Sequence, residues 1–436
     1  MKRKYEKKII FGILFISILC CFFVNRFNDV GNIRLTSEEM KEDYEYMWKT
    51  LEENFPLFEA IERIVGIDRE QVYTSYKEKC EKLPVTDVVD YYDLLNECLD
   101  EFEFVGHLSI ADPSVYYANV ELDDRTKAEV KKLHNRSERT YEFLQKELEE
   151  KAENFTETSQ SVIDGNEKVI HVRHYEETPI IKIDSFWCSN DEDVKEMVQQ
   201  LTGILHGEQD AEQIVFDLRG NRGGSTRVWE ESILPYLGKD EICMTTYSAR
   251  INGDMNQQKF PITVDEVNRI AVNSNVEYLV EPYAISQVLE IQEESDMEMS
   301  SLDISDLERC DVLLKTEMKV SIGEVADFNL DGDIVIFIDQ YTASAATDMA
   351  WFFQNARLAT IVGTENAGVR GAFSLPPSLS SFILPNSGLM VRYEPYYILR
   401  EDGECAEFGM NPDFIINEDE SVEWWLWKRE HEVIDE

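Results

Sequence analysis

A strand–turn–helix–strand unit near the end of the chain constrains the fold more than any other feature. Residues 332–339 form an apolar run typical of a buried strand, and small residues follow at 342–347. A helical pattern then extends to about residue 356, and a second strand-like run occupies residues 358–363. Two buried strands joined by a helix are typical of a parallel sheet covered by helices. The sequence therefore predicts a layered α/β core.

Ser344 lies at the turn of this unit, where the predicted strand ends and the helix begins. The first N–H groups of a helix are unpaired, and the helix dipole favours negative charge there. A nucleophilic oxygen and the oxyanion formed by its attack are both stabilised in such a place. The alternative is an N-cap serine with no further role.

Another strand-like run, residues 212–219, ends in a glycine-rich turn that contains Gly223 and Gly224. Adjacent glycines let backbone N–H groups approach a ligand closely. Ligands of open α/β sheets bind at the carboxyl edge of the strands, where we expect both this turn and Ser344.

Three motifs, in this order, resemble those of the tail-specific, or C-terminal processing, serine peptidase family (peptidase family S41). They are Asp217-Leu-Arg-Gly-Asn-Arg-Gly-Gly224, Thr342-Ala-Ser-Ala345 and Ile361-Val-Gly-Thr-Glu-Asn-Ala-Gly368. The resemblance covers residues 168–415 clearly and residues 36–110 weakly. It implies the fold of these peptidases and the hydrolysis of peptide bonds.

The resemblance also implies a role for each matching residue. Ser344 would be the nucleophile. The N–H of Ala345, with that of Gly223 or Gly224, would form the oxyanion hole. The family commonly carries a glutamate three residues after the serine, and Thr347 stands there in this chain.

A Ser–Lys mechanism, as used by the tail-processing branch, finds no suitable lysine here. The place about two dozen residues after the serine holds Arg370, and the only lysine beyond Ser344 is Lys428 in the tail. A guanidinium does not lose its proton at working pH, so Arg370 is no substitute.

His107 is the predicted general base. A helical stretch, residues 91–104, runs into Val105-Gly-His-Leu108, which resembles the Asp-x-His-Thr signature of the tricorn-core-like branch. Gly106 and His107 match the signature, whereas Val105 and Leu108 depart from it. An imidazole suits the transfer of a serine proton to the leaving amine. A histidine with a purely structural role is the alternative.

A glutamate near Gly409 would complete the catalytic set, as the tricorn-core-like branch implies. Glu407 lies two residues before this glycine and Glu404 lies five before it, so the register leaves both open, with Glu407 preferred. No Cys/His cluster has the spacing of a zinc site, and we expect neither a metal nor another cofactor.

The chain divides into segments of different composition. We expect a basic cytoplasmic flank (residues 1–8), a transmembrane signal anchor (9–25) and a helical sub-domain (36–111). These are followed by a charged helical insert without a PDZ domain (112–167), a peptidase core (168–420) and a tryptophan-rich tail (421–436). The flank stays inside by the positive-inside rule, which places the rest outside the cytoplasm at the cell membrane.

The net charge of −45 excludes nucleic acid as a partner, because 87 acidic residues outnumber 42 basic ones. We therefore expect an anchored extracytoplasmic serine peptidase acting on peptides or proteins. The alternative is a catalytically inactive relative that binds peptides or small apolar ligands, which the departures at Val105, Leu108 and Thr347 favour. The sequence leaves the substrate, the oligomeric state and disulfide pairing open.

Overall fold

The structure is a computed structural model that describes residues 33–120, 128–156, 169–188, 190–237, 241–259, 276–284, 303–321, 328–364, 380–400, 403–417 and 419–431. The predicted basic flank (1–8) and membrane anchor (9–25) lie outside these residues. Within the described ranges, no helix combines the length and the apolar character needed to cross a membrane.

The N-terminal region is built mainly of helices. Its first helices are α2 (Ser37–Asn54), α3 (Phe58–Val65), α4 (Arg69–Lys82) and α5 (Val88–Leu99). Their ends follow from the sequence: Thr36, Asp68 and Asp87 cap the N-termini of α2, α4 and α5 with side-chain oxygens, and α3 ends at Gly66 with a φ of 76°. The elements that follow are η1 (Asp100–Phe102), η2 (Val105–His107), β3 (Ser109–Ile110), α6 (Pro113–Val120) and α7 (Ala128–Thr156).

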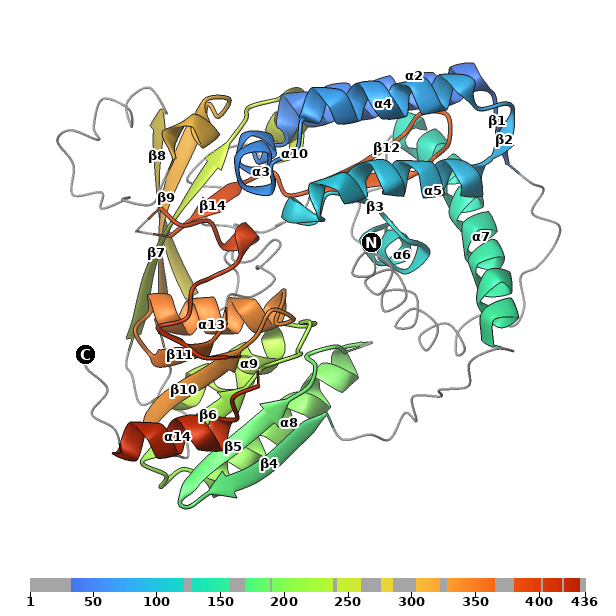
Figure 1. The fold of residues 1–436 in the computed structure, drawn as a ribbon. Coiled ribbons are helices and arrows are strands. Elements are labelled where there is room, and N and C mark those ends of the chain that lie inside the picture. Colours follow the sequence, from blue (N-terminus) through green and yellow to red (C-terminus); the bar gives the residue numbers. More distant parts are fainter. Residues whose placement is uncertain are drawn as a thin grey trace.

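A six-stranded sheet forms the centre of the second region, in the order β15-β11-β10-β6-β5-β4. The strands are β4 (Ile170–Tyr175), β5 (Thr178–Ile183), β6 (Gln213–Asp217), β10 (Asp333–Ile338), β11 (Ala359–Gly363) and β15 (Phe414–Ile415). All neighbouring pairs are parallel except β4 and β5. The predicted α/β core is therefore confirmed, and the carboxyl ends of β5, β6, β10 and β11 share one edge (Figure 1).

Alternate side chains of this sheet face different helices. Ile334, Ile336 and Ile338 pack with α8 (Asp191–Gly207), α9 (Arg227–Ser232) and α13 (Ala345–Asn355) on one face. Val335 and Phe337 pack with α14 (Val422–His431) on the other.

The tryptophan-rich tail docks on the sheet through only part of its aromatic side chains. Trp425 is buried at 3% exposure, whereas Trp424 and Trp427 are 38% and 45% exposed. Within this helix Trp425 therefore contacts the core, whereas Trp424 and Trp427 remain partly exposed.

Two antiparallel sheets were not predicted. One has the order β14-β7-β9-β8 and the other β12-β13-β3. Their strands are β7 (Glu241–Arg250), β8 (Val276–Ala284), β9 (Val312–Ser321), β12 (Ser380–Ile383), β13 (Met390–Tyr393) and β14 (Tyr397–Leu399). Smaller elements are β1 (Arg34–Leu35), β2 (Thr86–Asp87), η3 (Leu234–Tyr236), α10 (Asp254–Lys259), η4 (Ile304–Leu307) and η5 (Ala406–Phe408).

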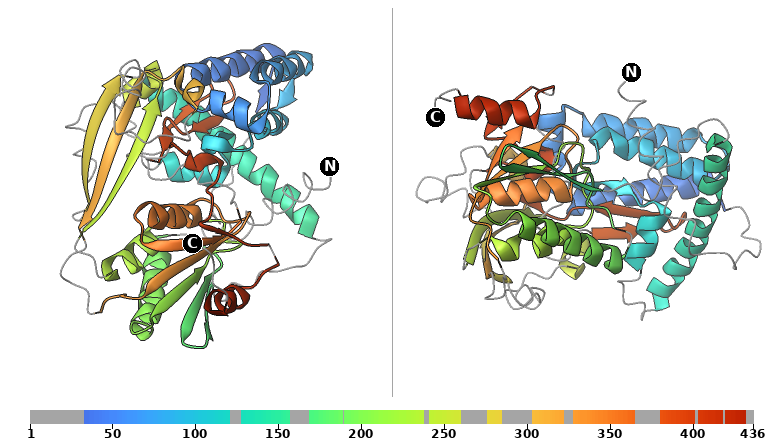
Figure 2. Two further views of the ribbon diagram at one scale, coloured as in Figure 1. Left: turned by 60° about the vertical axis from the view of Figure 1, so that its left-hand side comes forward. Right: turned by 90° about the horizontal axis from the view of Figure 1, so that it is seen from below.

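The late segment 380–399 packs against the N-terminal helices rather than against the six-stranded sheet (Figures 1 and 2). The N–H groups of Asn386 and Ser387 donate to the Asp43 carboxylate of α2, each at 2.7 Å. The sequence suggests two consecutive units, residues 36–111 and 168–420. In the structure the chain returns to the helical region after β11, so part of the second unit packs with the first.

Candidate active site

Ser344 lies between β10 and α13 in a backbone conformation that L-residues rarely adopt, with φ 52° and ψ −131°. It occupies the N-cap position of α13, but its side chain makes no capping hydrogen bond. An ordinary N-cap residue is extended and accepts a bond from the first turn. Ser344 therefore lacks the geometry of an ordinary capping serine, and its strained conformation points to a functional constraint.

The turn that carries Ser344 is fastened to the glycine-rich turn after β6. Asn221 is fully buried, and its carbonyl oxygen accepts the N–H of Ala343 at 3.0 Å. Its side chain donates to the carbonyl of Ile183 at 3.0 Å. Thr342 Oγ1 donates to the carbonyl of Leu218 at 3.1 Å. Three neighbouring strand ends are therefore held in one arrangement.

Gly223 packs directly against the serine. A Cβ atom on Gly223 would lie 2.6 Å from Ser344 Cβ and 2.8 Å from the Ala345 nitrogen, and its φ of 94° favours glycine. These two motifs, 121 residues apart in the chain, thus meet at the sheet edge.

The N–H groups of this turn differ in their partners. The Gly223 N–H donates to Asn221 Oδ1 at 2.8 Å, so it is used within the turn. The Gly224 N–H takes no part in the bridge to Phe186, whose bonds involve Gly223 O and the Ser225 N–H. The N–H of Ala345, the first residue of α13, has no partner within the helix. Of the two predicted glycine donors, the geometry favours Gly224.

His107 ends the tight turn η2 with a φ of 53°, and Glu407 holds this turn from a distant segment. The Gly106 N–H donates to Glu407 Oε2 at 2.9 Å, and the Gly106 carbonyl accepts the N–H of Glu394 at 2.7 Å. A Cβ on Gly106 would lie 2.6 Å from Leu57 Cδ1 and 2.7 Å from Phe55 Cε2, which explains why glycine precedes the histidine. The structure thus brings Glu407 beside the segment of His107.

Glu404 has different surroundings from Glu407. It is partly exposed, lies 3.6 Å from the Arg400 guanidinium and accepts a bond from Asn411 at 3.3 Å. Glu407 is 3% exposed. Of the two glutamates left open by the sequence, the structure favours Glu407.

Two further buried carboxyl groups, those of Asp348 and Glu394, lie near Glu407, which contacts the turn of His107. Asp348 lies in the first turn of α13, and burial raises its pKa well above the usual range, with further contributions from the charges of Glu407 and Glu230. Burial and the charge of Glu407 likewise raise the pKa of Glu394. Glu407 thus lies close enough to α13, the helix that follows Ser344, for its charge to act on Asp348.

The comparison with known families decides the identity of the chain. The model of peptidase family S41 matches residues 177–416, more than half of the chain, and includes both turns. The chain belongs to peptidase family S41. It is a serine-type peptidase and therefore a hydrolase. No curated protein matches it.

Several solved structures are similar to this S41 peptidase at low identity. Mature CPAF is 12% identical with a TM-score of 0.48, covering 87% of this chain and 92% of its own. A lipoprotein from Streptococcus agalactiae is 12% identical with a TM-score of 0.46, covering 94% and 98%. The photosystem II D1 C-terminal processing protease is 12% identical with a TM-score of 0.39, covering 88% and 94%. At these scores the likenesses carry no argument about individual residues.

Lys428 lies far from the nucleophile of the S41 peptidase in the architecture. It belongs to α14, on the face of the sheet opposite to α13, and its Nζ lies 4.9 Å from the Trp424 ring centre. The placement agrees with the exclusion of a Ser–Lys site.

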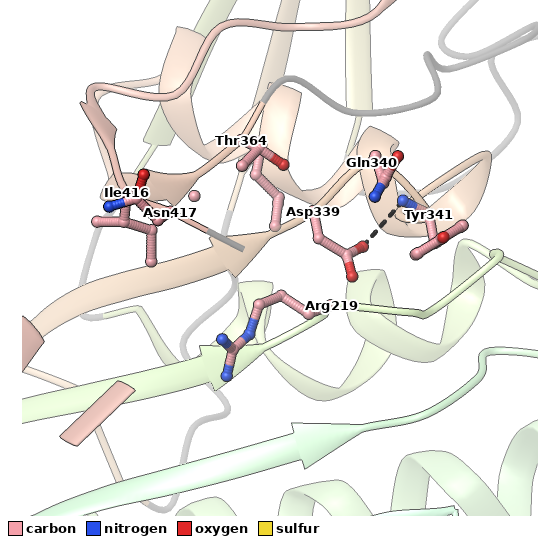
Figure 3. A pocket seen from close by; sticks show the side chains of 9 residues that line it. Arg219, Asp339, Gln340, Tyr341, Thr364, Ile416 and Asn417 are labelled. Carbon is pink, nitrogen blue, oxygen red and sulfur yellow. Dashed lines mark hydrogen bonds between the residues drawn. The ribbon is translucent and has the colours of Figure 1, made fainter. Parts of the chain in front are cut away.

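A cavity of about 120 Å³ opens beside the nucleophile turn, at the carboxyl ends of β10 and β11 (Figure 3). Its lining includes Asp339, Tyr341, Thr364 and the Arg219 side chain. Asp339 Oδ1 accepts the N–H of Tyr341 at 3.0 Å, so the carboxylate shapes the turn as well as the cavity.

Sequence reasoning missed the roles of Asn221, Asp348 and Glu394. Each had a signal: Asn221 is a matching residue of the glycine-rich motif, and the two acids interrupt apolar runs. An acid within an apolar run is often buried and paired, but its partners lie elsewhere in the chain.

Proposed function

We propose that this S41 peptidase hydrolyses peptide bonds by a Ser–His mechanism at the outer side of a cell membrane. The observation that carries the proposal is the strained, non-capping Ser344, which packs on Gly223 and precedes Ala345, whose N–H has no partner within the helix. Such an arrangement places a nucleophile beside N–H donors for an oxyanion.

Ser344 Oγ attacks the carbonyl carbon of the scissile bond while His107 accepts the hydroxyl proton. The N–H groups of Ala345 and Gly224 bind the oxyanion, and His107 gives the proton to the leaving amine. Glu407, through its 2.9 Å bond with the Gly106 N–H, holds the turn that carries the base. Water then hydrolyses the acyl-enzyme.

The membrane location rests on residues 1–25 of the sequence. Five of the first eight residues are Lys or Arg, and residues 9–24 contain no charged side chain. We propose an uncleaved signal anchor that leaves the peptidase outside the cytoplasm. Resistance of the membrane-bound chain to alkaline extraction, with digestion by protease added outside intact cells, would support it. Release into the alkaline supernatant would contradict it.

The mechanism is tested by labelling the full chain with a fluorophosphonate probe. We expect labelling on Ser344 in the wild type and none in Ser344→Ala, with tryptic mapping to identify the residue. Absence of labelling across a range of pH and after exposure to peptide would favour the alternative of an inactive, ligand-binding relative.

A further inference from the structure

Two arginines of the glycine-rich motif, Arg219 and Arg222, differ in their interactions. The Arg219 guanidinium is held by three hydrogen bonds. It donates to both carboxylate oxygens of Asp217 at 2.9 Å and to the carbonyl of Glu420 at 3.0 Å. Arg222 is exposed, and with the residues that the structure describes it forms no ion pair. The family motif includes Arg219, whereas Arg222 stands at one of its variable positions.

The arginines of the described ranges divide into those that pair with a carboxylate and those that do not. Acidic residues outnumber basic ones by 87 to 42. One group lies within 4.0 Å of a carboxylate: Arg63, Arg69, Arg173, Arg219, Arg227, Arg309 and Arg400. Arg222 belongs to the other group, together with exposed arginines such as Arg34, Arg357 and Arg429, which form no ion pair with the residues that the structure describes. No described carboxylate pairs with the Arg222 guanidinium, so with respect to these residues its N–H donors are available for a ligand.

Arg222 is placed beside the nucleophile by its backbone and steadied by an aromatic ring. It directly precedes Gly223, where an added Cβ atom would lie 2.6 Å from Ser344 Cβ. Its Cζ lies 5.7 Å from the ring centre of Tyr341, three residues before Ser344, and this ring is 51% exposed. A cation over a tyrosine face is attracted to it without using its N–H groups.

We propose that Arg222 binds a carboxylate of the peptide substrate next to the scissile bond. The inference rests on the proposed Ser344 mechanism, because it concerns the substrate of that site. A guanidinium binds a carboxylate through two parallel hydrogen bonds, which gives both strength and orientation. The strongly negative surface repels such substrates elsewhere, so a local cation beside the nucleophile selects where the carboxylate docks.

The carboxylate has two sources, an acidic side chain or the C-terminal end of the substrate. Both present the same planar pair of oxygens to Arg222. Matched peptides distinguish them: a Glu/Gln pair with an amidated end tests the side chain, and an acid/amide pair without acidic side chains tests the chain end.

The experiment uses the full chain in detergent and a peptide that the wild type cleaves at one mapped bond. Glu or Gln is placed at each of the three positions on either side of that bond, and the acid/amide pair is made in parallel. We expect one pair to favour the carboxylate by about tenfold in kcat/KM. The ratio of kcat/KM values within this pair should fall to about one in Arg222→Gln. It should take an intermediate value in Arg222→Lys, because lysine keeps the positive charge but cannot form two parallel hydrogen bonds with a carboxylate.

The matched control is Arg357→Gln, which removes an exposed arginine from the turn before β11, at the opposite edge of the same sheet. It should retain the wild-type preference. A wild type that prefers no carboxylate at any position, or a preference that survives Arg222→Gln, would overturn the proposal.

The same peptide pairs separate this inference from the mechanism itself. Binding to Ser344→Ala is measured by fluorescence anisotropy, with and without Arg222→Gln, and the ratio of Kd values replaces that of kcat/KM. If Ser344→Ala still hydrolyses peptides, the mechanism fails while the carboxylate preference stays measurable. If no peptide is hydrolysed, the binding ratio alone decides for or against Arg222.

Discussion

The two halves of the proposed site are held in different ways. The nucleophile half is fastened within one sheet, because Ser344, Gly223 and Asn221 lie on turns after neighbouring parallel strands. The base half depends on long-range contacts, since the turn of His107 is held by Glu407, whose partner Gly106 is 301 residues away in the chain. A site divided in this way has one half fixed by local sheet geometry and the other by the packing of separate regions.

The strongest test of the nucleophile half is Ser344→Ala. We expect peptidase activity to fall on the order of 10⁴-fold or more, because Ser344 is the proposed group that forms the acyl-enzyme. Single-turnover hydrolysis measures the loss, and circular dichroism checks that the fold is intact. Lys428→Ala, on the opposite face of the sheet, should leave the chemical step unchanged; a large loss there would revive a Ser–Lys mechanism.

The corresponding test of the base half is His107→Ala. It should cost about as much as Ser344→Ala, and the double mutant little more, because members of one catalytic unit are not additive. Wild-type activity should rise with pH through an apparent pKa of about 6–7, the ordinary histidine range. Turnover near the wild-type level in His107→Ala would remove histidine from the mechanism and leave the nucleophile half without its base.

Two glycines of one turn provide a matched test of how tightly the nucleophile half is packed. A Cβ at Gly223 would lie 2.6 Å from Ser344 Cβ, whereas a Cβ at Gly220 would meet nothing within 4 Å, although both residues have positive φ. We expect Gly223→Ala to lower kcat/KM by about 10²-fold, because it displaces the serine. Gly220→Ala should carry only the backbone strain, seen as lower stability. Equal activities would show that the contact is not needed.

Two glutamates test whether the base half depends on the long-range contact. Glu407→Gln weakens the acceptor of the Gly106 N–H, so we expect kcat/KM to fall about 10- to 100-fold. Glu404→Gln removes a partly exposed charge beside Arg400 and should change activity little. The reverse order of effects would assign the third catalytic residue to Glu404.

The smallest expected effect is a change in stability at Asp348, which lies in α13 near Glu407, between the two halves of the site. The folded-state pKa of Asp348 is raised by burial and by the charges of Glu407 and Glu230, so the folded chain keeps a proton that the unfolded chain releases above about pH 4. Stability from this group is therefore lost as pH rises. Asp348→Asn should gain stability relative to the wild type between pH 5 and 8, measured by chemical denaturation. Asp333→Asn, at an exposed position, is the control, and an equal trend in both would exclude Asp348 as the cause.

Much of the nucleophile half could be predicted because its signals are local. Apolar strands, a glycine pair and a lone serine among small residues lie within short segments, and parallel strands bring their carboxyl ends to one edge. The strained conformation of Ser344 and the use of the Gly223 N–H by Asn221 could not be predicted, since both depend on hydrogen bonds between turns.

The sequence by itself determined the α/β core, the helical front with its capped ends, the place of Ser344 and the order of the family motifs. Only the tertiary structure showed that Glu407 contacts the turn of His107, that Asp348 and Glu394 are its buried neighbours, and that residues 380–399 return to the helical region. The physical reason is the distance along the chain over which each kind of interaction acts. Periodicity and turn chemistry act between neighbours in the chain, whereas the partner of a buried carboxylate is set by packing between segments hundreds of residues apart.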